Sequence, residues 1–159
     1  MEKTMFHTQE NRRAKLTFPM LCNRTNAWFG EAYYFWADLK DAIHWGETSK
    51  DNNYDIYQAE IVTDKVLDTV FHEEHYNFLL RCLEKVANKC IQKTGRKPTK
   101  AHICNYFNNQ ANWKDEIDVL LACDYPCSSS ELFPGFQFRK RIQAAVYNDS
   151  VIHDFRLNS

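Results

Sequence analysis

Residues 30–38, which read Gly-Glu-Ala-Tyr-Tyr-Phe-Trp-Ala-Asp, constrain the fold of this chain more than any other segment. The glycine permits a tight turn, the four consecutive aromatic residues favour a strand, and Asp38 can cap a following helix. A buried strand requires apolar side chains, but it does not require an unbroken aromatic run. Because aromatic faces suit a flat heterocycle, the segment indicates either a tyrosine-rich core strand or a strand beside a ligand site.

Hydrophobic periodicity predicts an α+β chain with most strands near its two ends and helices between them. The predicted strands are residues 4–8, 33–36, 53–62, 117–123, 136–148 and 151–157. The predicted helices are residues 39–46, ending at Gly46, residues 68–93, and a shorter helix from a Thr99 cap to Phe107. Residues 9–27, which are charged and rich in Asn and Arg, predict a surface loop over a site, and residues 108–115 and 125–135 predict further loops.

Length and composition favour a single globular domain over residues 1–159, since 44% of the residues are hydrophobic. The net charge of −1 provides no basic field that would recruit nucleic acid. No stretch approaches the roughly 20 apolar residues of a membrane span, and the first residues lack the apolar core of a signal peptide. The six cysteines include no Cys-x-x-Cys pair, so we expect reduced thiols, no metal site, no membrane partner and a cytoplasmic location.

Three segments far apart in the sequence carry residues that we group into one candidate site. His7 and Thr8 end the first predicted strand, and Tyr34 lies in the aromatic strand. Gln143 lies in a late strand, where residues 141–147 read Arg-Ile-Gln-Ala-Ala-Val-Tyr. In this order the chain resembles the ADP-ribosyltransferase fold, in its His-Tyr-Glu branch, which includes the catalytic domains of the poly(ADP-ribose) polymerases.

The resemblance is most specific around the aromatic strand. In that branch, a strand with His and a small residue comes first, and a Gly-x-x-x-Tyr-Phe strand follows, with an Asp and an Ala-bearing helix after it. A late strand then has Val and Tyr three and four residues after Glu. The second motif is matched here by Gly30, Tyr34, Phe35, Asp38 and Ala42, with one extra residue before the aspartate. Val146 and Tyr147 match the third motif, but Gln143 replaces the glutamate.

The resemblance implies split antiparallel β-sheets with helices between them, and NAD as a substrate. It implies that His7 hydrogen-bonds the adenosine ribose, that backbone at Thr8 pairs with the nicotinamide amide, and that Tyr34 stacks on the nicotinamide ring. His44 or Trp45 would close the other face of that ring. Candidate pyrophosphate contacts are Arg12, Arg13 and Arg24. The expected NAD-binding residues are therefore His7, Thr8, Arg24, Gly30, Tyr34, Phe35, Ala42 and His44.

The glutamine limits the chemistry that the resemblance implies. A glutamate at that position would bind the ribose 2′-hydroxyl, stabilise an oxocarbenium-like transition state and help to activate an acceptor. Gln143 keeps the hydrogen bonding but loses the negative charge and the base, and Glu131 or Asp149 is a candidate for the missing carboxylate. We therefore predict a toxin- or effector-like, NAD-dependent mono-ADP-ribosyltransferase with His7, Tyr34 and Gln143 as its catalytic residues.

The acceptor and the partners stay open at the level of sequence. A protein or a nucleic acid can serve as acceptor, and the toxin-like interpretation leaves room for an antitoxin or regulatory protein partner. Because Gln143 lacks a charge, one alternative is an inactive module of the same fold that binds a nucleotide or a protein. A second alternative is an RNA 2′-phosphotransferase-like activity, which would need several arginines to converge on phosphates.

Other patterns give weaker hypotheses. His72 and His75 are three residues apart, not the four of a zinc-binding His-Glu-x-x-His helix. Neighbouring positions such as His102 and Cys104 do not by themselves make a nucleophilic dyad. The basic run at 139–141 predicts a solvated strand face, and on that interpretation Gln143 would point to solvent from an edge strand.

Overall fold

The computed structural model describes residues 1–124 and 140–158. In chain order its elements are β1 (Glu2–Glu10), β2 (Tyr33–Trp36), α1 (Leu39–Ser49), β3 (Tyr54–Val62), β4 (Val66–Asp68), α2 (Glu73–Thr94), α3 (Lys100–Asn109), β5 (Val119–Asp124), β6 (Arg141–Val146) and β7 (Ile152–Leu157). Short 3₁₀ helices at Asn112–Glu116 and Asp149–Val151 precede β5 and β7. The predicted loop at 125–135 and the first part of the predicted strand at 136–148 lie outside the described residues.

The described strands form one seven-stranded sheet in the order β4-β5-β6-β2-β1-β3-β7. Strands β4 and β5 are parallel, and each other neighbouring pair is antiparallel. The late strand β6 lies between β5 and β2, so that residues near the C-terminus pair directly with the aromatic strand. This mixed sheet and the three described α-helices confirm the predicted α+β class.

Strands β1 and β2 are joined at one register pair, with Phe6 opposite Trp36. By contrast, β1 pairs with β3 from Glu2 to Glu10, and β2 pairs with β6 along all four of its residues. The sheet is therefore continuous, but it consists of two well-paired halves, β4-β5-β6-β2 and β1-β3-β7. The described strands therefore form one continuous sheet with a parallel β4–β5 pair, and not the split antiparallel sheets that the resemblance implies.

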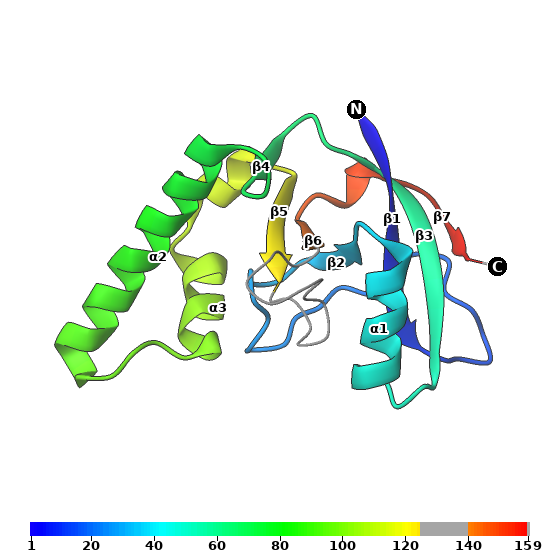
Figure 1. Cartoon of the computed structure of the whole chain (residues 1–159), viewed down its shortest axis with the longest axis horizontal. Coiled ribbons are helices and arrows are strands. Elements are labelled where there is room, and N and C mark those ends of the chain that lie inside the picture. The colour runs from blue at the N-terminus through cyan, green and yellow to red at the C-terminus, as the bar shows by residue number, and fades with distance from the viewer. Residues whose placement is uncertain (125–139, 159) are drawn as a thin grey trace, which may run out of the picture.

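Two apolar clusters follow from the alternation of side chains along the strands. One cluster joins both halves of the sheet, with Met5 and Ile61 from one half and Phe35, Leu121 and Val146 from the other. The second lies between β5, β6 and the helices α2 and α3, and includes Leu79, Phe107, Leu120, Ala122 and Ala145. Figure 1 shows α2 and α3 together on one side of β5, with α1 beside β1 and β3.

Helix α1 continues past the glycine that was predicted to end it. Gly46 is buried inside the helix, and α1 ends at Ser49 with Lys50 as its C-cap. A Cβ at Gly46 would come within 2.4 Å of the Tyr54 ring, so the glycine serves helix-to-strand packing and does not terminate the helix. Sequence alone could not reveal this, because Tyr54 reaches Gly46 only after the chain turns back into β3.

Helix α2 begins at Glu73 and not at residue 68, where the predicted helix started. Residues Val66–Asp68 form β4, which pairs in parallel with β5. The Asp68 carboxylate accepts hydrogen bonds from the backbone of Val70 and Phe71 at 2.9 Å, which stabilises a turn before the helix. His72 is the N-cap of α2, and Gly95 ends the helix in the left-handed conformation at φ 69°. Thr99 caps α3 as predicted.

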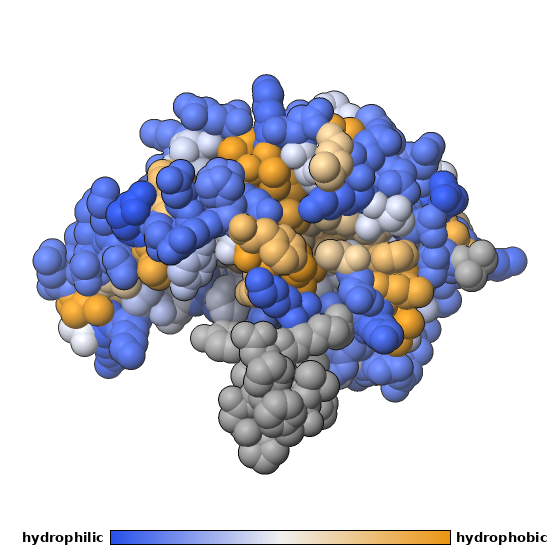
Figure 2. Space-filling model, turned by 45° about the horizontal axis from the view of Figure 1, so that its top comes forward, coloured by the Kyte–Doolittle hydropathy of each residue, from blue (hydrophilic) through white to orange (hydrophobic). Residues whose placement is uncertain are grey.

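Hydrophilic side chains cover most of the face in Figure 2, with apolar side chains gathered near its middle. Among the described residues, no helix has the length and apolar character needed to cross a lipid bilayer.

Gly30→Ala should destabilise the fold by about 2–4 kcal/mol, because Gly30 has φ +77° and a Cβ there would lie 2.5 Å from Asn108 Oδ1 and 2.9 Å from Phe107 Cβ. Gly95→Ala is the matched control, since Gly95 has φ +69° but its Cβ would meet open space. That variant should lose only about 1 kcal/mol. Urea unfolding of both variants measures the difference, and equal losses would contradict the packing role of Gly30.

Candidate functional site

A cleft of about 460 Å³ opens where β1 and β2 diverge. Its walls come from the end of β1, from the segment between β1 and β2, and from β2, α1, α3 and β6. His7, Tyr34 and Gln143 all line this cleft. The structure therefore brings together the three residues that the sequence grouped, although they lie in three different strands.

His7 bridges the divergence between the two strands. Its Nδ1 lies 2.8 Å from the Tyr34 carbonyl oxygen, and its Nε2 lies 3.4 Å from the Met20 backbone nitrogen. A neutral imidazole with its proton on Nδ1 satisfies both contacts, by donating to Tyr34 and accepting from Met20. Burial lowers the pKa of His7 below 6.5, and the nearby positive charge of Lys50 lowers it further, against the effect of the Tyr34 hydrogen bond.

Tyr34 lines the cleft and packs against the second apolar cluster, while its hydroxyl is engaged in the preceding turn. The hydroxyl donates to the Gly30 carbonyl at 2.6 Å and accepts from the Phe29 backbone nitrogen at 3.0 Å. Burial raises the pKa of Tyr34 well above its usual value of 10.0. The phenol therefore stays neutral, and its hydroxyl is committed to two backbone partners.

Gln143 occupies a central strand, not a sheet edge. It pairs with Trp36 of β2 on one side and with Ala122 of β5 on the other. Neighbouring Arg141 is buried, with its Nε 3.5 Å from Asp41 and its guanidinium over the Trp36 ring. For Arg141 and Gln143 the interpretation as a solvated edge strand is therefore wrong, because β6 inserts between β5 and β2. Arg139 lies outside the described residues.

The cleft is more basic than the chain as a whole. Its lining includes Arg12, Arg24, Lys50 and Lys100, and Glu10 is the acidic residue among them. Lys50 Nζ lies 2.6 Å from Glu10, and this hydrogen bond lowers the pKa of that carboxyl. A surplus of positive charge in a partly enclosed cleft favours an anionic ligand.

The remaining predicted residues divide into two groups. Thr8 and Arg24 line the cleft, and the Thr8 hydroxyl donates to the Ala42 carbonyl at 2.7 Å, which fixes α1 against β1. Four others are not among its lining residues: Gly30, Phe35, Ala42 and His44. Phe35 and Ala42 are fully buried in packing positions, and Gly30 lies against α3.

Trp45, the alternative to His44 in the sequence analysis, lines the cleft, and its ring centroid lies 6.0 Å from that of Trp36. Two further lining residues, Trp28 and Lys100, had no signal in the sequence. Lys100 reaches the cleft from the start of α3, where its Nζ lies 4.4 Å from the centre of the Trp28 ring. Helical periodicity within α1 could have favoured Trp45, but nothing local to Trp28 or Lys100 indicates that they meet.

Of the two carboxylates considered for the missing base, Glu131 lies outside the described residues, and Asp149 is not a lining residue of the cleft. Within 1–124 and 140–158, no group of three or more His, Cys, Asp or Glu side chains is arranged to hold a metal ion.

Comparisons with known proteins return no match from family models, from curated proteins or from solved structures.

Lowering the pH should destabilise the protein through His7. Because its pKa is lowered in the folded state, the unfolded chain binds a proton more readily, so stability is retained above pH 6.5 and falls as the pH drops below it. His7→Asn keeps a donor near the Nδ1 position but removes the titration. It should cost about 1–2 kcal/mol near neutral pH, since the packing of the buried ring against Phe35 and Phe155 is lost.

Denaturant unfolding between about pH 5 and 8 measures this slope, since an unperturbed histidine titrates near 6.5. His153→Asn serves as the control, because His153 is exposed. A slope for His7→Asn as steep as that of the wild type would contradict the assignment.

Proposed function

We propose that the protein is an NAD-dependent mono-ADP-ribosyltransferase. The observation that carries this proposal is the convergence of His7, Tyr34 and Gln143 on one basic cleft at the joint between β1 and β2. The order of these residues along the chain is the order in the His-Tyr-Glu branch that the sequence resembles.

The cleft offers separate features for the two ends of a dinucleotide. The Tyr34 ring and the indole of Trp45 can hold a flat nicotinamide, while Arg24 and Lys100 supply charge for the pyrophosphate. His7 Nε2 has only a long contact, 3.4 Å, with the Met20 amide. A ribose hydroxyl can displace this weak partner and donate to the same nitrogen.

In the proposed reaction the glycosidic bond between nicotinamide and ribose breaks through an oxocarbenium-like transition state. Residues of the cleft bind the two ends of NAD and thereby fix the orientation of that bond. Gln143 provides hydrogen bonds to the ribose but no negative charge. We therefore propose a single transfer to a good nucleophile, and not elongation of a polymer.

The acceptor in this proposal is a protein or a nucleic acid. An antitoxin or a regulatory protein is the partner that we expect for a toxin-like enzyme of this kind, acting in the cytoplasm. A second candidate function is nucleotide binding without turnover. Gln143 favours it, because loss of a charged group that stabilises the transition state commonly costs about 10²–10³ in rate.

Incubation with radiolabelled NAD and cell lysate should release nicotinamide and transfer label to an acceptor. Calorimetry on the same preparation should detect NAD binding, and Trp45→Ala should weaken that binding several-fold because a stacking face is lost. Binding without nicotinamide release would favour the inactive module. Absence of binding by a folded preparation would contradict both functions.

Gln143→Glu should raise the rate of nicotinamide release by about 10²–10³-fold, because it restores a negative charge beside the developing positive ribose. Gln92→Glu makes the same chemical change at an exposed position of α2 and should leave the rate unaltered. If the glutamate variant binds NAD but reacts no faster than the wild type, Gln143 is not placed at the reacting ribose.

A further inference from the structure

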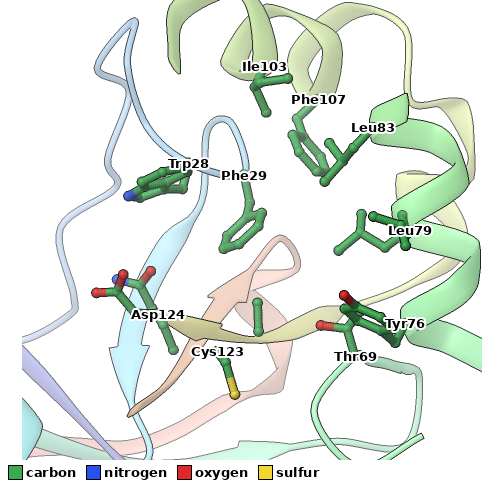
Figure 3. A pocket seen from close by; sticks show the side chains of 13 residues that line it. Trp28, Phe29, Thr69, Tyr76, Leu79, Leu83, Ile103, Phe107, Cys123 and Asp124 are labelled. Carbon is green, nitrogen blue, oxygen red and sulfur yellow. The ribbon is translucent and has the colours of Figure 1, made fainter. Parts of the chain in front are cut away.

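A second cavity, of about 290 Å³, lies between β5, β6 and the helices α2 and α3. We call it the apolar pocket, since Phe29, Leu79, Leu83, Ile103 and Phe107 form most of its wall. Figure 3 shows these side chains turned toward a common space, with Asp124 and Trp28 toward one end and Tyr76 and Thr69 toward the other. The basic cleft and the apolar pocket therefore differ sharply in chemistry.

Gln143 and Trp28 line both cavities. The apolar pocket thus reaches the side chain that the proposed function assigns to the reacting ribose. A group held in this pocket would lie beside that ribose without competing for the residues that bind the rest of NAD.

Asp124 places a carboxylate in the lining of the apolar pocket, on the strand next to Gln143. In the antiparallel pairing of β5 with β6, Ala122 is opposite Gln143 and Asp124 is opposite Arg141. Asp124 and Gln143 are therefore diagonal neighbours on one face, a spacing that side chains commonly span. Arg141 Nη1 lies 3.7 Å from the Asp124 carboxylate, and Arg141 is itself fixed by Asp41, so the carboxylate is held in position.

We propose that the apolar pocket is the acceptor site and that Asp124 is the catalytic base. The inference rests on the proposed function and names its acceptor as a phenolic hydroxyl on an apolar body, such as a tyrosine side chain. Nicotinamide leaves with the electron pair of the broken glycosidic bond. The phenolic oxygen forms the new bond to ribose C1′, and its proton passes to the Asp124 carboxylate.

Size and chemistry select this class of acceptor. A cavity of about 150 Å³ lined by Leu, Ile and Phe already binds benzene, so the apolar pocket has room for one substituted ring. Its apolar lining disfavours a charged and strongly hydrated acceptor. A phenol, with a pKa of about 10, loses its proton far more readily than an alkyl alcohol. A phenol therefore suits a site in which Gln143 stands in place of the glutamate of the resembled branch and cannot act as a base.

The experiment measures transfer from NAD to para-cresol and to N-acetyltyrosinamide, with benzyl alcohol as an alkyl hydroxyl of similar size. The wild type should modify both phenols and spare benzyl alcohol. Modification of para-cresol alone would assign a small phenol as the acceptor, and preference for the tyrosine derivative would assign a protein side chain. Transfer to an oligonucleotide with neither phenol modified would overturn the proposal.

Leu83→Trp fills the pocket from α2 without adding a residue to the cleft. It should raise the KM for para-cresol at least about tenfold, because one ring would occupy the space of another, and leave the Kd of NAD unchanged. Ile91→Trp, at an exposed position of the same helix, is the control. An unchanged KM in a folded Leu83→Trp variant would show that the acceptor binds elsewhere.

Asp124→Asn tests the base while nearly preserving shape. It should lower kcat by about 10²-fold or more, and its rate should rise about tenfold per pH unit as phenolate forms in solution, below the phenol pKa of about 10. Asp124→Glu should restore part of the rate. A structural role alone would lower the rate without this pH dependence, and that result would remove Asp124 from the mechanism.

Failure of this inference is distinguishable from failure of the proposed function. If the wild type binds NAD and releases nicotinamide but modifies neither phenol, the acceptor site is wrong while the proposed function stands. If NAD does not bind, both are wrong, even if NMR titration with para-cresol shifts the methyl signals of Leu79, Leu83 and Ile103.

Discussion

The single register pair between Phe6 and Trp36 is the constraint on which the site depends. If β1 and β2 paired along their full length, their backbones would close the space that the cleft now occupies. Beyond the pair, the His7 imidazole makes a hydrogen bond to the Tyr34 carbonyl at 2.8 Å, where a backbone partner would otherwise stand. This hydrogen bond therefore adds a link between the two halves, beside the Phe6–Trp36 pair and the apolar cluster that both halves share.

The site depends also on the insertion of β6 between β5 and β2, which brings Gln143 to the cleft. It places Gln143 opposite Trp36 and beside the Tyr34 strand, although more than a hundred residues separate them in the sequence. Because side chains alternate along β6, Ala144 enters the core between the halves and Gln143 faces α2 and α3. The same side chain therefore lines the basic cleft and the apolar pocket.

The sequence alone predicts those elements whose structure depends mainly on residues that are close together in the chain. The strand Tyr33–Trp36, the Thr99 cap and the α+β class could all be predicted, since β propensity and capping act over a few residues. The packing roles of Gly30 and Gly46 could not be predicted, because their partners, Asn108 and Tyr54, come from other elements. The burial of Arg141 and the meeting of Trp28 with Lys100 depend on strand order and helix docking, which no local pattern encodes.

A crystal structure of the protein with an NAD analogue whose glycosidic bond cannot be cleaved tests the proposed NAD site most directly. We expect the nicotinamide ring on Tyr34, its amide against the backbone near Thr8, and the pyrophosphate beside Arg24. An analogue bound outside the space between β1 and β2, or a cleft that stays empty at saturating analogue, would contradict this expectation.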